Sequence, residues 1–151
     1  MYQKPINRVS HVVFCVKTEN FPTTVAFWEN AYGIAFHDID IPRLGLRVKL
    51  AIEAGLEIIT PAPDLGPVVG RVADFLATKG EGVYSVVFGV RHMDEAIARA
   101  AANGVEHSIR HTVRQPKDPL PAIIESVEEA HLAPFMGTQI ILGQVELREQ
   151  K

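Results

Sequence analysis

The sequence predicts an α+β fold built from two copies of one β-α-β-β-β module. The first observation is an internal repeat, because residues 10–16 read Ser-His-Val-Val-Phe-Cys-Val and residues 84–90 read Tyr-Ser-Val-Val-Phe-Gly-Val. The second is that a helical pattern follows each copy of the repeat. The third is size, since 151 residues with 47% hydrophobic composition can bury the core of one domain. We therefore expect a single domain over 1–151, with modules at 6–63 and 80–148.

The first module is predicted to contain one helix and several strands. Residues 9–16 are apolar and β-branched, which indicates a buried strand. Apolar residues at helical spacing from Val25 to Tyr32, with Gly33 placed to cap the C-terminus, predict a helix. Proline and glycine then separate three further predicted strands, at 34–41, 46–54 and 56–60.

A segment rich in proline and glycine, residues 61–82, connects the two halves. We expect a short helix within it, at 68–77.

The second module is predicted to open with a strand at 83–90. The alanine-rich stretch 93–103, which ends at Gly104, predicts a helix. Later strands are expected at 105–114 and 138–146. Between them, a loop with several prolines is predicted to carry a helical insertion at 122–131, although we expect this half to follow the same β-α-β-β-β order.

Composition narrows the classes of partner and compartment. The net charge is −3 and no basic run occurs, which argues against a nucleic-acid partner. No apolar run is long enough for a membrane span, and the N-terminus lacks a signal core. Cys15 is the single cysteine, so no intramolecular disulfide can form, and a reducing compartment fits. We expect a soluble, cytoplasmic protein that does not bind membranes.

Two stretches of the second half resemble a known superfamily. They are Gly80-Glu81-Gly82-Val83-Tyr84-Ser85-Val86-Val87-Phe88-Gly89-Val90, and the helix start Met93-Asp94-Glu95-Ala96 with the later Asn103-Gly104-Val105. They resemble the second-module opening of methylmalonyl-CoA epimerases. With the two-module pattern, almost the whole chain is similar to the vicinal oxygen chelate superfamily, which also includes glyoxalase I, extradiol dioxygenases and bleomycin-resistance proteins. The resemblance implies an eight-stranded open cup with helices outside.

The resemblance also implies a metal site on the first and last strands of each module, and this chain matches it only in part. His11 and Glu57 occupy the two positions of the first module, whereas Ser85 and Ile141 stand in the second where a histidine and a glutamate are usual. A mononuclear site usually needs three protein ligands. We therefore expect no tightly bound metal, and at most a weakly held divalent ion on His11 and Glu57. A noncanonical set made of these two residues and a further histidine stays open.

Other residues are candidates for binding a substrate. Gln139 lies two residues before Ile141 on the same strand face, and aligning 55–59 with 137–141 would instead make Gln139 the counterpart of Glu57. The substrate-binding candidates are Ser85, Gln139, Lys49 and His37. Surface positions are the ordinary expectation for the remaining histidines, including His111 and His131.

Two classes of function follow from this set of residues. The preferred one is a glyoxalase- or epimerase-like lyase or isomerase that abstracts a proton next to the carbonyl of a small organic substrate. Glu57 or His11 would be the base, and Ser85 or Gln139 would hold the enolate oxygen. The alternative is a metal-free protein that binds small molecules or confers resistance. A metal-dependent dioxygenase is disfavoured because a facial triad of ligands is missing from the family positions.

We expect a homodimer, because an open sheet edge invites pairing.

Overall fold

The chain packs as two compact units in a computed structural model that describes residues 2–64 and 70–149. One unit is Val12–Tyr84, and the other combines Met1–His11 with Ser85–Lys151. Starting from its first strand, the hydrogen-bonded order in the first module is β1 (Arg8–Cys15), β4 (Leu56–Pro61), β3 (Leu46–Ala51) and β2 (His37–Asp38). In the second module the order is β5 (Gly82–Gly89), β8 (Gln139–Leu147), β7 (Ile124–Leu132) and β6 (His107–Arg114). Each module has the order β-α-β-β-β along the chain, so the predicted α+β fold is confirmed.

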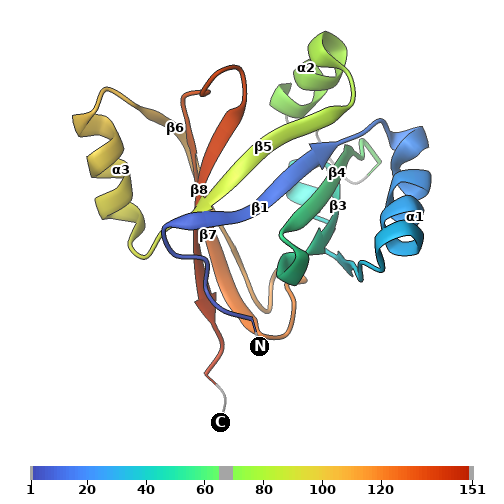
Figure 1. Ribbon diagram of the computed structural model, residues 1–151, viewed down its shortest axis with the longest axis horizontal. Helices are drawn as coiled ribbons and strands as arrows, with labels where there is room; N and C mark the ends of the chain where they lie inside the picture. The colour runs from blue at the N-terminus through green and yellow to red at the C-terminus, as the bar shows by residue number, and fades with distance from the viewer. Residues whose placement is uncertain (1, 65–69, 150–151) are drawn as a thin grey trace. The chain divides into compact units, whose positions relative to one another are not determined.

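In the first module, helix α1 (Phe21–Tyr32) covers one face of the strands (Figure 1). Strand β1 (Arg8–Cys15) runs parallel to β4 (Leu56–Pro61), and β3 (Leu46–Ala51) pairs antiparallel with β4. The helix and strands bury a shared apolar cluster of Val16, Phe21, Val25 and Ile58. The predicted end of α1 is confirmed, because Gly33 adopts a left-handed conformation with φ of 67°.

The second strand of this module is shorter than predicted. Strand β2 (His37–Asp38) has two residues where the sequence predicts a strand over 34–41. The backbone N–H groups of Gly33 and Ile34 donate to the carbonyls of Glu29 and Trp28, which completes the cap of α1 and keeps the next residues out of the sheet. Strand β3 likewise ends early, because a 3₁₀ turn occupies Ile52–Ala54.

The connector contains the expected helix. Helix α2 (Gly70–Lys79) overlaps the predicted range 68–77, whose first two residues lie outside the described residues. The ring of Phe75 meets the ring of Tyr84 edge-on, with centroids 5.3 Å apart. No helix within 2–64 and 70–149 combines the length and the apolar character needed to span a membrane.

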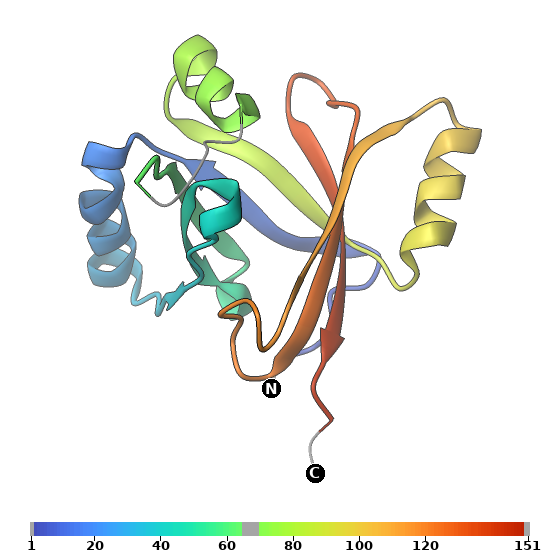
Figure 2. The same ribbon diagram turned by 180° about the vertical axis from the view of Figure 1, so that it is seen from behind.

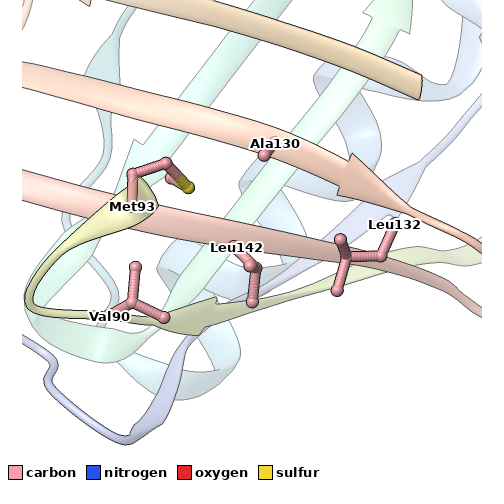
Figure 3. Close-up of a cluster of buried hydrophobic side chains, with 5 residues drawn as sticks. All are labelled: Val90, Met93, Ala130, Leu132 and Leu142. Atoms are coloured by element: carbon pink, nitrogen blue, oxygen red, sulfur yellow. The ribbon is translucent and has the colours of Figure 1, made fainter. Parts of the chain in front are cut away.

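In the second module, β5 (Gly82–Gly89) runs parallel to β8 (Gln139–Leu147). Strand β7 (Ile124–Leu132) lies between β8 and β6 (His107–Arg114) and is antiparallel to both. Figure 2 draws β6 and β7 in orange and β8 in red. Helix α3 (Met93–Ala102) covers one face, over the buried cluster of Val90, Met93, Ala130, Leu132 and Leu142 (Figure 3).

The predicted helical insertion at 122–131 is wrong, because this segment forms most of β7. The run of Glu128, Glu129 and Ala130 favours a helix by its composition. The segment nevertheless buries every second residue at several points, including Ile124, Ser126, Ala130 and Leu132. Pairing with a strand on each side satisfies its backbone groups, and this tertiary contribution outweighs local propensity.

Candidate functional site

Two histidines and a glutamate converge on β6 and β7. His111 and Glu129 are directly opposite each other in the antiparallel pair, and Nε2 of His111 lies 3.2 Å from Oε2 of Glu129. His131 follows Glu129 by two residues, so its side chain leaves the same face of β7. The potential ligand atoms of all three residues lie within 4.8 Å of one another. We call this group the β6–β7 triad.

The β6–β7 triad lies on the face of the sheet that α3 does not cover. Ala130 and Leu132 alternate with Glu129 and His131 along β7, and they pack into the cluster beneath α3. The triad is therefore separated from the α3 core by the thickness of the sheet. Its side chains are only partly exposed, at 26% for His111 and 19% for Glu129.

Glu129 is held as a carboxylate by the imidazoles around it. Burial on its own would raise the pKa of Glu129. The hydrogen bond from His111 and the charges of His111, His11 and His131 outweigh burial and lower the pKa below its usual value. This balance also shows that His11, from β1, lies within electrostatic reach of Glu129.

His11 is buried, with 4% of its surface exposed. Its Nδ1 lies 3.0 Å from Oγ of Ser10, which orients the ring. The sequence-based prediction that His11 is a base or a metal ligand stays a prediction. What the structure adds is an electrostatic interaction between His11 and the carboxylate of Glu129.

Ser85 and Gln139 are neighbours on β5 and β8, where the ladder pairs them directly. Ser85 is fully buried, and its Oγ has no hydrogen-bond partner among the residues that the structure describes. Gln139 is half-buried, and its Nε2 donates to the carbonyl oxygens of Leu132 at 2.6 Å and Ile140 at 2.9 Å. The amide group of Gln139 is thus engaged with the backbone, whereas the hydroxyl of Ser85 is an unsatisfied polar group.

The strand register decides which residue is the counterpart of Glu57. In the first module the ladder pairs Val13 with Glu57, and in the second it pairs Val87 with Ile141. Val13 and Val87 are equivalent in the repeat, so Ile141, and not Gln139, occupies the position of Glu57. A hydrocarbon side chain cannot bind a cation, and the neutral hydroxyl of Ser85 is a poor ligand. The residues at these second-module positions therefore do not fit a metal ion.

The remaining predicted residues lie in the unit Val12–Tyr84. Glu57 is half-buried on β4, and its neighbour Ile58 packs beneath α1, so Glu57 points to the uncovered face. His37 is exposed on β2 and shares that face, because both residues pair with Leu50. Lys49 points to the opposite face and forms an ion pair with Asp38. The structure thus places Lys49 apart from Glu57, and the roles predicted for His11, Glu57, Ser85 and Gln139 stay predictions.

The β6–β7 triad was missed by the sequence analysis, which expected its histidines at the surface. The available signal was Glu129-Ala130-His131, in which an acid and a histidine are separated by one residue. That spacing places both on one face of a strand but on different faces of a helix. Because the segment was predicted to be helical, the pair was not recognised.

When the chain is compared with known proteins, the matches come from solved structures and not from sequences. No family model matches the sequence, and no curated protein matches it significantly. Methylmalonyl-CoA epimerase from Mycobacterium tuberculosis superposes with a TM-score of 0.69 at 16% identity, covering 95% of this chain and 91% of that chain. The Streptomyces coelicolor methylmalonyl-CoA epimerase in complex with 2-nitronate-propionyl-CoA gives 0.69 at 21% identity, covering 92% and 97%.

A further match extends the comparison to a larger protein. A variant of 4-hydroxymandelate synthase from Streptomyces coelicolor gives a TM-score of 0.67 at 15% identity, covering 98% of this chain and 51% of that chain. These identities are low, so the likeness concerns the fold. Together with the repeated module, it confirms the resemblance at that level: the chain has the fold of the vicinal oxygen chelate superfamily.

Proposed function

We propose that the protein is an enzyme that moves a proton at the carbon next to a carbonyl group of a small organic substrate. The observation that carries the proposal is the buried imidazole of His11 within the field of the ionised carboxylate of Glu129. Such a carboxylate stabilises the imidazolium that forms when the ring accepts a proton. The fold shared with methylmalonyl-CoA epimerases supports this class of reaction by analogy.

The residues of the unit that contains His11 have complementary roles in this reaction. The substrate C–H bond breaks, its proton passes to Nε2 of His11, and its electron pair moves onto the carbonyl oxygen. The hydroxyl of Ser85, which is buried and unsatisfied, donates to that enolate oxygen. Return of the proton to carbon regenerates the base and completes an epimerisation or isomerisation. Glu57 is the second candidate base, because it is a half-buried carboxylate on an uncovered sheet face.

The experiment follows exchange of the substrate proton with solvent. The full chain is incubated in D₂O with methylmalonyl-CoA, a small 2-oxo acid or a 2-hydroxy ketone, and loss of the α-proton signal is recorded by NMR. We expect wild-type exchange on one of these compounds. His11→Asn should slow it by about 10²–10⁴, the usual contribution of a general base. His107→Ala is the matched control, since His107 is an exposed histidine of β6, and it should exchange like wild type.

Two other results would change the assignment. Loss of exchange in Glu57→Gln with normal exchange in His11→Asn would assign the base to Glu57 instead of His11. Saturable binding of a test compound by calorimetry, without exchange in the wild type, would refute the enzyme and favour a binding or resistance protein. The mismatch at Ser85 and Ile141 favours that second candidate, because binding does not require the metal ligands of the superfamily.

The assembly and compartment are part of the same proposal. Strand β6 stands at the end of the strand order, which leaves an edge able to pair with a second copy. A homodimer at micromolar concentration in light scattering is therefore expected, and a monomer would contradict it. The single cysteine, Cys15, is a buried free thiol, which supports a reducing compartment such as the cytoplasm.

A further inference from the structure

We propose that the β6–β7 triad, His111, Glu129 and His131, binds a divalent transition-metal ion. This site is distinct from the positions implied by the superfamily resemblance, which lie on the first and last strands of each module. Here the ligands come from the two intervening strands, β6 and β7. The ion would thus be held by one antiparallel strand pair within a single unit of the chain.

The geometry of the triad is close to that of an assembled site. Ligand atoms about 2.1 Å from a tetrahedral ion are about 3.4 Å from each other. Nε2 of His111 and Oε2 of Glu129 are already 3.2 Å apart, and the full set lies within 4.8 Å. Rotation of side chains is enough to close the remaining gap. The cross-strand pair and the two-residue spacing fix the three Cα atoms relative to one another.

The donor set selects a class of metal. Two imidazoles and one carboxylate suit Zn²⁺, Fe²⁺ or Co²⁺, whereas Mg²⁺ and Ca²⁺ prefer oxygen ligands throughout. Three protein ligands leave coordination positions for water or a substrate oxygen.

The second imidazole of the triad favours a bound metal ion over an ion pair that only stabilises the fold. Glu129 already has one partner, since Nε2 of His111 lies 3.2 Å from its Oε2. His131 brings a second imidazole, whose ring centroid lies 5.7 Å from that of His111. A carboxylate that is paired with one imidazole does not need the other, whereas two imidazoles and a carboxylate at this spacing are a ligand set that divalent transition metals use. A divalent cation between them binds all three ligands at once, and the stabilisation of His11 by the free charge of Glu129 proposed above then belongs to the metal-free protein.

The experiment measures metal binding directly and makes no use of turnover. Full-length protein without an affinity tag is freed of metal with a chelator, then titrated with Co²⁺ and Zn²⁺ by absorption spectroscopy and calorimetry. We expect one ion per chain. His131→Ala and Glu129→Gln should each weaken binding at least tenfold, because changes even beyond the ligands cost this much. X-ray absorption should report two imidazoles and an oxygen ligand.

Matched controls separate the triad from nonspecific binding. His107→Ala removes an exposed histidine of β6, and Glu128→Gln removes the neighbouring carboxylate that faces the other way, toward Arg110. Both should bind like wild type, and circular dichroism should show that all variants fold. Absence of saturable binding, or equal loss in the controls, would overturn the site. Loss in a His11→Asn, Glu57→Gln double variant with normal binding in triad variants would place the ion at the superfamily positions instead. Because binding and proton exchange are measured separately, failure of one proposal leaves the other testable.

Discussion

Glu128 and Glu129 are adjacent in β7, but they point to opposite faces of the sheet and meet different partners. Glu128 pairs with Arg110, which also contacts Asp94 at 2.8 Å near the start of α3. Glu129 pairs with His111 on the uncovered face. The first carboxylate thus ties β7 to the helix side, while the second supplies the negative charge of the candidate site. This alternation makes Glu128 a control for experiments on Glu129.

Metal should stabilise the folded chain only when the β6–β7 triad is intact. Binding at a hundredfold excess over Kd adds about 2.7 kcal/mol to the free energy of unfolding. For a chain of this size the increase corresponds to roughly 5–10 °C in Tm. Scanning calorimetry with and without Zn²⁺ should show this rise for wild type and Glu128→Gln, and little or none for Glu129→Gln. A rise of equal size in all three proteins would count against the triad.

Replacing Ser85 with alanine should stabilise the fold while weakening function. The buried hydroxyl of Ser85 lacks a hydrogen-bond partner among the described residues, so its removal relieves a desolvation cost of about 1 kcal/mol. Thr60→Val is the contrasting variant, because Thr60 is equally enclosed and its Oγ1 donates to Oγ1 of Thr18 at 3.4 Å. Urea unfolding should show opposite signs for the two changes. A destabilised Ser85→Ala protein would show that the hydroxyl serves the fold.

Glu81 should contribute stability that is lost in acid. The backbone N–H of Lys17 donates to Glu81 at 2.9 Å, and Nδ2 of Asn20 donates at 3.0 Å, just before α1. These hydrogen bonds lower the pKa of Glu81 from its ordinary value of 4.5. A lowered folded-state pKa means that the contribution is complete above that ordinary value and fades as pH falls through the folded pKa.

The corresponding variant gives the size of this effect. Glu81→Gln should lose about 0.5–1 kcal/mol of unfolding free energy at pH 7, a modest amount because the carboxylate is exposed. The difference from wild type should shrink in urea titrations below pH 4.5. Glu53→Gln, which changes an exposed carboxylate in the same unit, should show no such trend. A difference in unfolding free energy between Glu81→Gln and wild type that stays constant at the lowest pH measured would contradict this role of Glu81.

The thiol of Cys15 should be inert in the native protein. Burial and the nearby charge of Glu81 raise the pKa of Cys15 to about 12, and the residue is fully enclosed. The thiolate is the reactive form, so almost none is available near neutral pH. A disulfide reagent should modify the thiol at pH 8 only after denaturant is added. Rapid reaction of the folded protein would show that β1 opens readily.

Much of the fold could be predicted because local and tertiary signals agree. The Val-Val-Phe repeat marks β1 and β5, Gly33 ends α1, and the alanine-rich stretch forms α3. At β7 the local and tertiary signals disagree. Glu128, Glu129 and Ala130 have helical composition, and only pairing with two neighbouring strands makes the segment extended.

The candidate site was harder to predict than the fold. Ser85 could be recognised as a departure from the superfamily positions, because the repeat aligns it with His11. Whether Ile141 or Gln139 is the counterpart of Glu57 was decided only by the strand register. The β6–β7 triad could not, since it depends on the register that sets His111 against Glu129. The expectation of no tightly bound metal counted ligands at the superfamily positions alone. Register arises from long-range pairing, which a single sequence specifies weakly.

The most direct test of the account is an anomalous-difference map from crystals grown with Zn²⁺, because it locates the ion without reference to activity. The account predicts one peak per chain, about 2.0–2.2 Å from a nitrogen of His111, a nitrogen of His131 and a carboxylate oxygen of Glu129. A peak on His11 and Glu57, or no peak at the triad under saturating Zn²⁺, would contradict it.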